Sequence, residues 1–322
     1  MKKILGIGNA LVDILIQIND DIVLEQLDLP KGSMQLVDHE RAMIVQEATK
    51  GNKRELVSGG SAANTIAGIA ELGAPSAFIG TICKDKMGEV FENDLLKANI
   101  KPLLAYSQTQ TGTATTLISK DSERTFATHL GAAIELSSKD LTKDLFAGYD
   151  FFYIEGYLVQ NHELLETAVR IAKENNQKVF LDLASYNVVE ENLDFLHEII
   201  KKYVDVVFAN EEEAKAFTGL QPNEALDYIA ELCEIAVVKI GKKGSMIKNE
   251  DKKIHIDILK VKSIDTTGAG DQYAAGFMYG MAIGKSLEEC GRYGSILSAY
   301  VIQQYGARIK DEKWTEIKEL LS

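Results

Sequence analysis

Residues 265–277 read Asp-Thr-Thr-Gly-Ala-Gly-Asp-Gln-Tyr-Ala-Ala-Gly-Phe. Two glycines around one alanine, at the start of a helix-like run, let successive backbone N–H groups point outward and form a seat for an anion. Asp271 would lie in the first helical turn, where the same N–H groups favour its ionised form. One interpretation is that Asp271 takes a proton from a substrate hydroxyl while the amides of Gly268–Gly270 hold the charge on a transferring phosphoryl group. The alternative is an ordinary helix start with Asp265 or Thr266 as its N-cap.

A second glycine-containing motif lies nearer the N-terminus, where residues 57–65 read Val-Ser-Gly-Gly-Ser-Ala-Ala-Asn-Thr. Gly59 and Gly60 let the backbone approach another group closely. Asn64, one helical turn later, can both donate and accept hydrogen bonds. Small residues continue to Gly73, which is predicted to end a helix as its C′ residue.

Together the two motifs resemble the signatures of the ribokinase-like (PfkB) carbohydrate and nucleoside kinases, and they occur in the right order. In that family the last Asp of the C-terminal motif is the catalytic base, and the Gly-Ala-Gly segment is the anion hole. The resemblance implies the role of base for Asp271. It implies an anion hole formed by Gly268, Ala269 and Gly270. It also implies a sugar site formed by Gly59, Gly60 and Asn64.

The resemblance also implies the fold class, an α/β protein with three αβα layers, a mainly parallel central sheet and a small β-sheet lid. A single domain would span residues 1–322, with the lid contributed by approximately 11–38 and 103–128. Alternating polar and apolar residues are consistent with this lid, because they predict short extended segments. These segments are Leu11–Ile18, Met34–Val37, Leu103–Tyr106, Ala114–Ser119 and Thr125–Thr128.

The N-terminal segment 8–13, Gly-Asn-Ala-Leu-Val-Asp, places an acid inside an apolar run. It is not a dinucleotide-binding fingerprint, because the third glycine is missing and the following residues are strand-like. An ionised group in such surroundings needs a partner, and a sugar diol supplies donors. The segment resembles the opening of the family's nucleoside kinase branch, where this Asp binds sugar hydroxyls, so the resemblance assigns that role to Asp13. The open alternative is a solvent-facing Asp on an edge strand.

Arg124 lies at the last turn of the expected lid. In the resembling family a lid arginine reaches the transferring phosphate, and an acidic protein needs such a clamp. The alternative is a solvated arginine beside Asp121 and Glu123.

Short apolar runs alternate with helical segments from about residue 149, which predicts a parallel sheet covered on both faces. Ligands bind such sheets beyond the carboxyl ends of the strands. Asn210 and Glu213 fall at one of these ends and resemble the family's Asn-x-x-Glu motif, which orders the Mg²⁺ shell. An N-capped, acid-rich helical turn explains them equally well. Further candidates for nucleotide binding at the next strand are Lys239, Gly241 and Gly244.

The C-terminal region contains Gly-Met-Ala-Ile-Gly-Lys-Ser at 280–286, which is not a phosphate-binding P-loop because one spacer residue and the preceding strand are missing. Residues 302–307 resemble a loop that holds a monovalent cation in several family members. The resemblance therefore implies a K⁺ site near Asp265, Thr267, Ile302 and Tyr305.

The composition excludes several classes of function. A net charge of −13 over 322 residues disfavours nucleic acid as a partner. Three widely spaced cysteines suggest neither a disulfide framework nor a zinc ribbon. No apolar run is long enough to span a membrane, and no signal peptide is evident, so we expect a cytoplasmic protein.

The resulting expectation is an ATP- and Mg²⁺-dependent kinase that phosphorylates a primary hydroxyl of a small molecule. Residues 182–187 lack the Asp-x-Asn-x-Arg pattern of many sugar-acid kinases, and the opening around Asn9 looks like adenosine kinases. Adenosine is therefore the favoured acceptor, and fructose, ribose or 2-keto-3-deoxygluconate is the alternative. A non-catalytic nucleoside-binding regulator is a remote alternative. We expect a monomer or a homodimer formed through the lid.

Overall fold

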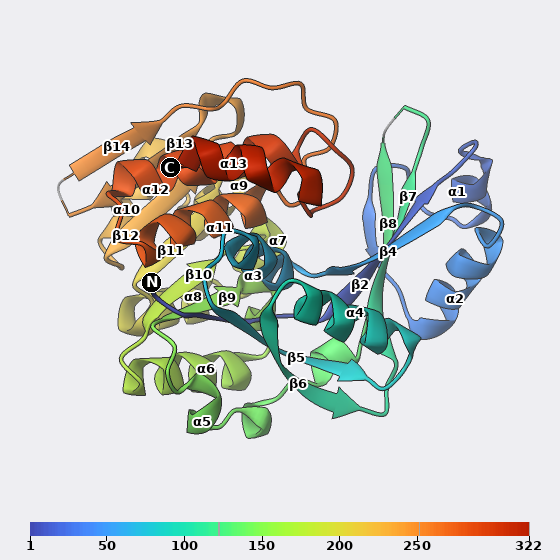
Figure 1. Cartoon of the computed structure of the whole chain (residues 1–322), viewed down its shortest axis with the longest axis horizontal. Coiled ribbons are helices and arrows are strands. Elements are labelled where there is room, and N and C mark those ends of the chain that lie inside the picture. Colours follow the sequence, from blue (N-terminus) through green and yellow to red (C-terminus); the bar gives the residue numbers. More distant parts are fainter. Residues whose placement is uncertain (122, 251, 322) are drawn as a thin grey trace.

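Two β-sheets organise the chain in the computed structural model, which describes residues 1–121, 123–250 and 252–321 (Figure 1). The larger sheet has nine strands in the order β14-β13-β12-β11-β10-β9-β1-β5-β6. Seven are parallel, and only β13 and β14 run antiparallel to their neighbours. The strands are β1 Ile4–Ile7, β5 Ser76–Cys83, β6 Ile100–Ser107, β9 Phe151–Glu155, β10 Lys178–Asp182, β11 Val206–Asn210, β12 Ile235–Lys239, β13 Ser245–Asn249 and β14 Lys252–Ile256.

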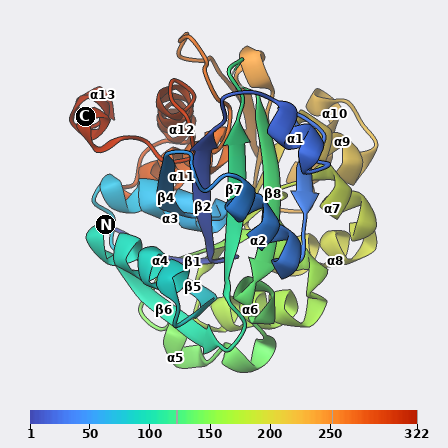
Figure 2. The ribbon, with the colours of Figure 1, turned by 90° about the vertical axis from the view of Figure 1, so that its right-hand side faces the viewer.

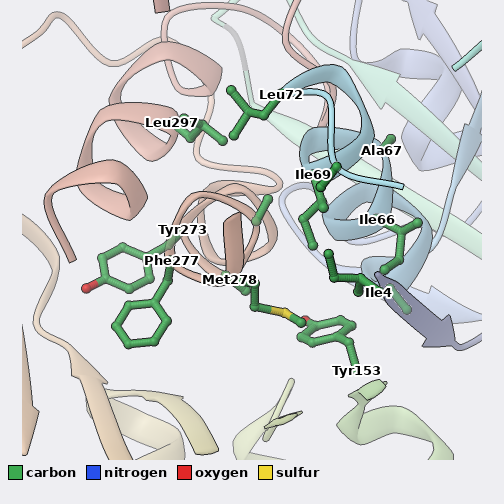
Figure 3. Packing of buried hydrophobic residues seen from close by; sticks show 14 of the residues in the cluster. Ile4, Ile66, Ala67, Ile69, Leu72, Tyr153, Tyr273, Phe277, Met278 and Leu297 are labelled. Carbon is green, nitrogen blue, oxygen red and sulfur yellow. The ribbon is translucent and has the colours of Figure 1, made fainter. Parts of the chain in front are cut away.

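Helices cover both faces of the large sheet. Successive side chains of a strand point to opposite faces, and in these strands the side chains on both faces are apolar. Phe151 and Tyr153 face one core, whereas Phe152 and Ile154 face the other. Figure 3 shows the first core, where Tyr153 and Ile4 meet Phe277 and Met278. Its helices are α3 Ser61–Glu71, α4 Lys86–Lys97, α11 Ala269–Ala282, α12 Leu287–Val301 and α13 Trp314–Leu321. The second core is covered by α5 Lys143–Phe146, α6 His162–Glu174, α7 Tyr186–Glu191, α8 Leu193–Tyr203, α9 Glu211–Thr218 and α10 Pro222–Ala230. Within the described ranges, none of the helices has the length and apolar character needed to cross a bilayer.

The smaller sheet has five strands in the order β3-β8-β7-β2-β4. Helices α1 Ile22–Gln26 and α2 His39–Ala48 lie over its outer face (Figure 2), and a third core is enclosed between them and the sheet. Ile14 and Ile16 point into this core, so Asp13, which alternates with them, lies on the opposite face. The strands are β2 Leu11–Gln17, β3 Met34–Leu36, β4 Arg54–Gly59, β7 Thr111–Ile118 and β8 Arg124–Gly131.

The expected α/β class, with a mainly parallel sheet and a second small sheet, is confirmed. One strand assignment is wrong: Leu103–Tyr106 belongs to β6, which pairs in parallel with β5 in the large sheet and not in the lid. Helix α4 connects the end of β5 to the start of β6. A strand that follows such a crossover helix usually joins the same sheet as the strand before it. The small sheet instead includes β4, whose mixed residues gave no alternating pattern.

Helices α11 and α12 approach closely at a pair of glycines. A Cβ on Gly276 would lie 2.5 Å from the Tyr293 carbonyl oxygen, and a Cβ on Gly294 would lie 2.8 Å from the Tyr273 carbonyl oxygen. Backbone atoms cannot yield as a flexible side chain can. The start of α11, which carries Asp271, is therefore positioned by a contact that only glycine permits.

Gly276→Ala is expected to destabilise the protein by about 1–3 kcal/mol, because overpacking at this contact outweighs the better helix propensity of alanine. Thermal unfolding should show a fall in Tm of several degrees. Gly51→Ala is the control, since a Cβ on Gly51 meets nothing within 4 Å. An unchanged Tm for Gly276→Ala would mean that the two helices separate without cost.

Candidate active site

Polar side chains gather at the carboxyl edge of the large sheet. The last residues of β9, β10, β11 and β12 are Glu155, Asp182, Asn210 and Lys239. The small sheet begins at the same edge, because β1 ends at Ile7 and β2 starts only four residues later. The carboxyl ends of parallel strands are where ligands bind in α/β folds.

Asp271 lies where the N-termini of α3 and α11 meet. Ser61 Oγ donates a hydrogen bond to Asp271 Oδ1 over 2.7 Å, and Asn64 Nδ2 donates to Oδ2 over 3.1 Å. Burial raises the pKa of Asp271 to about 6, while these two hydrogen bonds lower it. A half-buried carboxylate with such a pKa is ionised near neutral pH and can still accept a proton. The structure therefore brings Asn64 and Asp271 together, as expected from the two motifs.

The glycines before Asp271 form an open helix start. Gly268 has φ of 73° and precedes α11 without any side-chain hydrogen bond to cap the helix. A Cβ on Gly268 would lie 2.6 Å from Ala307 Cα, so this close approach also requires glycine. The first N–H groups of a helix have no intrahelical acceptor. Asp265 does not cap the helix and instead accepts a hydrogen bond from Thr267 N. Ala269 N donates to the Thr266 carbonyl over 3.2 Å, so the amides of Gly270 and Asp271 are the ones suited to hold an anion.

A positive charge lies beside this anion seat. Lys239 Nζ is 2.9 Å from Asp182 Oδ2 and would be 3.1 Å from a Cβ on Gly270. Burial opposes the charge on Lys239, but Asp182 and Glu213 keep its pKa above the usual value. Lys239 therefore stays protonated next to the segment proposed to hold phosphate.

Asn210 and Glu213 form a complete capping box at the start of α9. Asn210 N and Nδ2 donate to the two carboxylate oxygens of Glu213, and Asn210 Oδ1 accepts from Glu213 N. Burial raises the pKa of Glu213, and the Lys239 charge lowers it. The capping alternative from the sequence is thus present, although Glu213 also belongs to the charged group around Lys239.

Gly241 and Gly244 frame the turn between β12 and β13. Both have positive φ, 53° and 93°. A Cβ on Gly244 would lie 1.9 Å from the Ile256 carbonyl oxygen, so backbone packing requires this glycine. The turn follows Lys239 directly, which places it beside the charged group.

Asp13 faces the glycine pair from the neighbouring strand. A Cβ on Gly59 would lie 2.3 Å from Asp13 Oδ1, and a Cβ on Gly60, with φ of 92°, would meet the Asn9 carbonyl. Burial raises the pKa of Asp13 to about 7, while the charge of Arg308 lowers it. Among the described residues, none donates a hydrogen bond to the Asp13 carboxylate. The sequence alternative of a solvent-facing acid does not fit this environment.

Arg124 connects the lid to the main body. Its Nη1 lies 2.6 Å from Asp265 Oδ1, and neither side chain is widely exposed. Asp265 also accepts hydrogen bonds from Thr267 N and Gly306 N. Arg124 therefore contacts Asp265, a few residues before Gly268, and is not solvated beside Asp121.

The residues of the expected K⁺ site do lie together. The Ile302 carbonyl oxygen accepts hydrogen bonds from the backbone N–H groups of Ile264 and Asp265, and Asp265 contacts the Thr267 and Gly306 amides. Tyr305 precedes Gly306. A cation at the Ile302 carbonyl would compete with two amides for the same oxygen. Among the described residues, no cluster of three His, Cys, Asp or Glu is arranged as a metal site.

Sequence reasoning missed several residues of the site. Glu155 accepts hydrogen bonds from Asn9 N, Asn9 Nδ2 and Ala62 N, and so holds β1 against the start of α3. Burial raises the pKa of Glu155 to about 7, while these hydrogen bonds lower it. Polar residues that end buried strands were a usable signal for Glu155 and Asp182. No pattern pointed to Arg308, which contacts Asn64 from the C-terminal loop.

Comparisons with known proteins agree with this geometry. Residues 33–314 match the family described as pfkB family carbohydrate kinase. A probable sugar kinase from Rhizobium etli has a crystal structure with a TM-score of 0.90 and 32% identity, covering 100% of this chain and 99% of its own. The crystal structure of adenosine kinase from Sinorhizobium meliloti has a TM-score of 0.88 and 32% identity, covering 99% of each chain. A nucleoside kinase of Methanocaldococcus jannaschii is 31% identical over 82% of this chain and 85% of its own length.

These similarities define a phosphotransferase with an alcohol group as acceptor. The chain belongs to the pfkB family of carbohydrate kinases, and it is a kinase of the adenosine kinase and sugar kinase type.

Proposed function

We propose that this kinase transfers the γ-phosphoryl group of ATP to the primary hydroxyl of a ribonucleoside, with adenosine as the favoured acceptor. The observation that carries the proposal is the position of Asp271. Its carboxylate lies in the first turn of α11, after the uncapped glycine start, and on the same side of the fold as the carboxylate of Asp13, which accepts no hydrogen bond from the described residues. A proton acceptor, an anion seat and a group for sugar hydroxyls thus converge.

Asp13 and the Gly59–Gly60 backbone would hold the sugar. A carboxylate without a protein donor is costly when buried, and two adjacent hydroxyl groups can satisfy both of its oxygens. The missing side chain at Gly59 leaves room for the Asp13 carboxylate, and the missing side chain at Gly60 leaves room for the Asn9 carbonyl, so both glycines shape the site around Asp13. The hydroxyl to be phosphorylated would then point towards Asp271.

Transfer begins when this hydroxyl gives its proton to the Asp271 carboxylate. The alcohol oxygen forms a bond to the γ-phosphorus while the bond from phosphorus to the bridging oxygen breaks, and ADP leaves. The amides of Gly270 and Asp271 and the charge of Lys239 would stabilise the equatorial oxygens of the phosphoryl group. Positioning and electrostatics supply most of the catalysis in such reactions.

ATP would lie on the β11–β12 side of the anion seat, with its phosphates near Lys239, Gly241 and Gly244. Carboxylate oxygens suit Mg²⁺. Asp182 and Glu213 would contact Mg²⁺ through its bound water molecules and not directly. Asp182 already pairs with Lys239, and both carboxylate oxygens of Glu213 accept hydrogen bonds from Asn210. When bound, Mg²⁺ would neutralise charge on the phosphates. K⁺ near Asp265 and Thr267 is a weaker proposal, and Arg124 would contribute by holding the lid to this segment.

The nucleoside is favoured over a free sugar by the segment at residues 8–13 and by the similarity to the Sinorhizobium meliloti adenosine kinase. The probable sugar kinase from Rhizobium etli is equally identical in sequence, so a sugar acceptor is the second candidate.

An acceptor screen tests the proposal. ADP formation from ATP and Mg²⁺ should be measured with adenosine, inosine, ribose, fructose and 2-keto-3-deoxygluconate. We expect the highest kcat/KM with adenosine, and none with 5′-deoxyadenosine, which lacks the hydroxyl. Preference for a sugar would overturn the choice of nucleoside but keep the kinase. Nucleoside binding without ADP formation would instead favour the non-catalytic regulator.

A further inference from the structure

The guanidinium of Arg308 joins β4 and α3, the two segments that meet at the Gly59–Gly60 pair. Arg308 Nε donates a hydrogen bond to Asn64 Oδ1 over 3.0 Å, and Arg308 Nη2 donates to Ser58 Oγ over 2.8 Å. Ser58 N is itself held by Asp94 Oδ2 at 2.9 Å. Arg308 therefore bridges β4 and α3 from a loop that follows α12.

This contact determines which way the Asn64 amide faces. Arg308 has only donors, so the group of Asn64 that meets it must be the carbonyl oxygen. The NH₂ group then faces Asp271 Oδ2, at 3.1 Å. In the opposite orientation the carbonyl oxygen would face a carboxylate and the NH₂ group would face a guanidinium, and both contacts would be repulsive.

The loop that carries Arg308 is fixed to the start of α11. Gly306 N donates to Asp265 Oδ2 over 2.9 Å, and Gln272 Nε2 donates to the Ala307 carbonyl over 3.2 Å. Ala307 also packs against Gly268. Residues on both sides of the anion seat thus hold the loop, and the position of Arg308 is coupled to that of Asp271.

We propose that Arg308 is a positioning residue for the catalytic base, because it locks the Asn64 amide with its NH₂ group towards Asp271. The inference rests on the proposed function, in which Asp271 must be ionised to accept a proton. A donor to a carboxylate stabilises its ionised form. Asn64 would then act on Asp271, in place of the sugar contact that the sequence predicted for it, because both ends of its amide are engaged by protein groups.

Other charged and polar groups also face Asp271, and they set the background for its titration. Besides Arg308 and the donors Ser61 and Asn64, they are Asp182, Lys239, Asp13, Tyr153, Glu155 and Tyr157. Asp182 opposes ionisation of Asp271 and Lys239 favours it. Arg308 also acts on Asp13 and Asp271 through its charge, and this effect, unlike one exerted through Asn64, would persist in an Asn64→Ala background.

The test compares pH profiles of kcat/KM for the wild type, Arg308→Met and Arg308→Lys. Methionine keeps much of the volume but removes the donors, so the Asn64 amide loses its orientation and the acidic limb should move to higher pH. We expect the activity ratio of Arg308→Met to wild type to be about tenfold lower at pH 6 than at pH 8.5. Lysine should restore part of the loss. Arg170→Met, an exposed arginine on α6, is the matched control.

Asn64→Ala provides the second measurement. If Arg308 acts through Asn64, adding Arg308→Met to Asn64→Ala should change the profile little, since the effects of coupled residues are not additive. A loss that is equal at all pH values, or fully additive with Asn64→Ala, would overturn the proposal. So would a rise in acceptor KM alone. An inactive wild type, or a fully active Asp271→Asn, would instead refute the proposed function.

Discussion

Asp271→Asn is expected to lower turnover by about 10²–10⁴-fold, the contribution of a general base, while ATP binding is retained. The amide has the size of the carboxylate, and its oxygen can still accept the hydrogen bond from Ser61 or Asn64. It cannot take up a proton. The hydroxyl of the acceptor would then have to lose its proton to water, which is a much weaker base than a carboxylate.

Single-turnover rates with saturating ATP and adenosine measure this effect directly, and Tm confirms that the fold is kept. Asp257→Asn is the matched control, because the Asp257 side chain is 97% exposed. Turnover of Asp271→Asn within a factor of two of wild type would show that another group is the base.

The pH dependence of the wild type follows from the same carboxylate. Burial raises the pKa of Asp271 to about 6. A base works only when it is unprotonated, so kcat/KM should rise with pH through this value and level off above it. In Asp271→Asn this limb should disappear from the residual activity.

Much of the site was predictable because glycines and acids at fixed spacing leave a trace in the sequence. Gly268, Gly60 and Gly73 all have positive φ, where a side chain would be strained. The order of the two motifs indicated the family, but the hydrogen bond between Asn64 and Asp271 was not predicted, because the sequence assigned Asn64 to the sugar site. Apolar runs of four to five residues gave the strands of the parallel sheet, since these are buried on both faces.

What the sequence could not show were contacts that depend on tertiary placement. Arg308 lies in a loop without periodicity, and only the fold brings it to Asn64 and Ser58. The alternation in Leu103–Tyr106 is the same for a strand in either sheet, so its neighbours could not be inferred. Arg124 was expected to reach the transferring phosphate, but it pairs with Asp265, which lies far along the chain and could not be identified as its partner.

Asp13→Ala is expected to lower kcat/KM for the acceptor by about 10²–10³-fold and leave the KM for ATP unchanged. Two hydrogen bonds from sugar hydroxyls to a carboxylate are worth roughly 1.5–3 kcal/mol each, and part of this is offset by hydration of the free site. A comparison of adenosine with 2′,3′-dideoxyadenosine tests whether the loss comes from the missing contacts to the sugar hydroxyls. The wild type should discriminate strongly between them, and Asp13→Ala should not.

Stability distinguishes this loss of function from a loss of structure. Burial raises the pKa of Asp13 to about 7. An acid whose pKa is higher in the folded state binds more protons when folded, so the wild type loses stability as pH rises from about 4 to about 7. Asp13→Ala lacks this penalty, so at pH 8 its Tm should equal or exceed that of the wild type. Asp20→Ala, an exposed acid just beyond β2, is the control. A lower Tm for Asp13→Ala at pH 8, with unchanged discrimination against the dideoxynucleoside, would assign Asp13 to the scaffold and remove it from the sugar site.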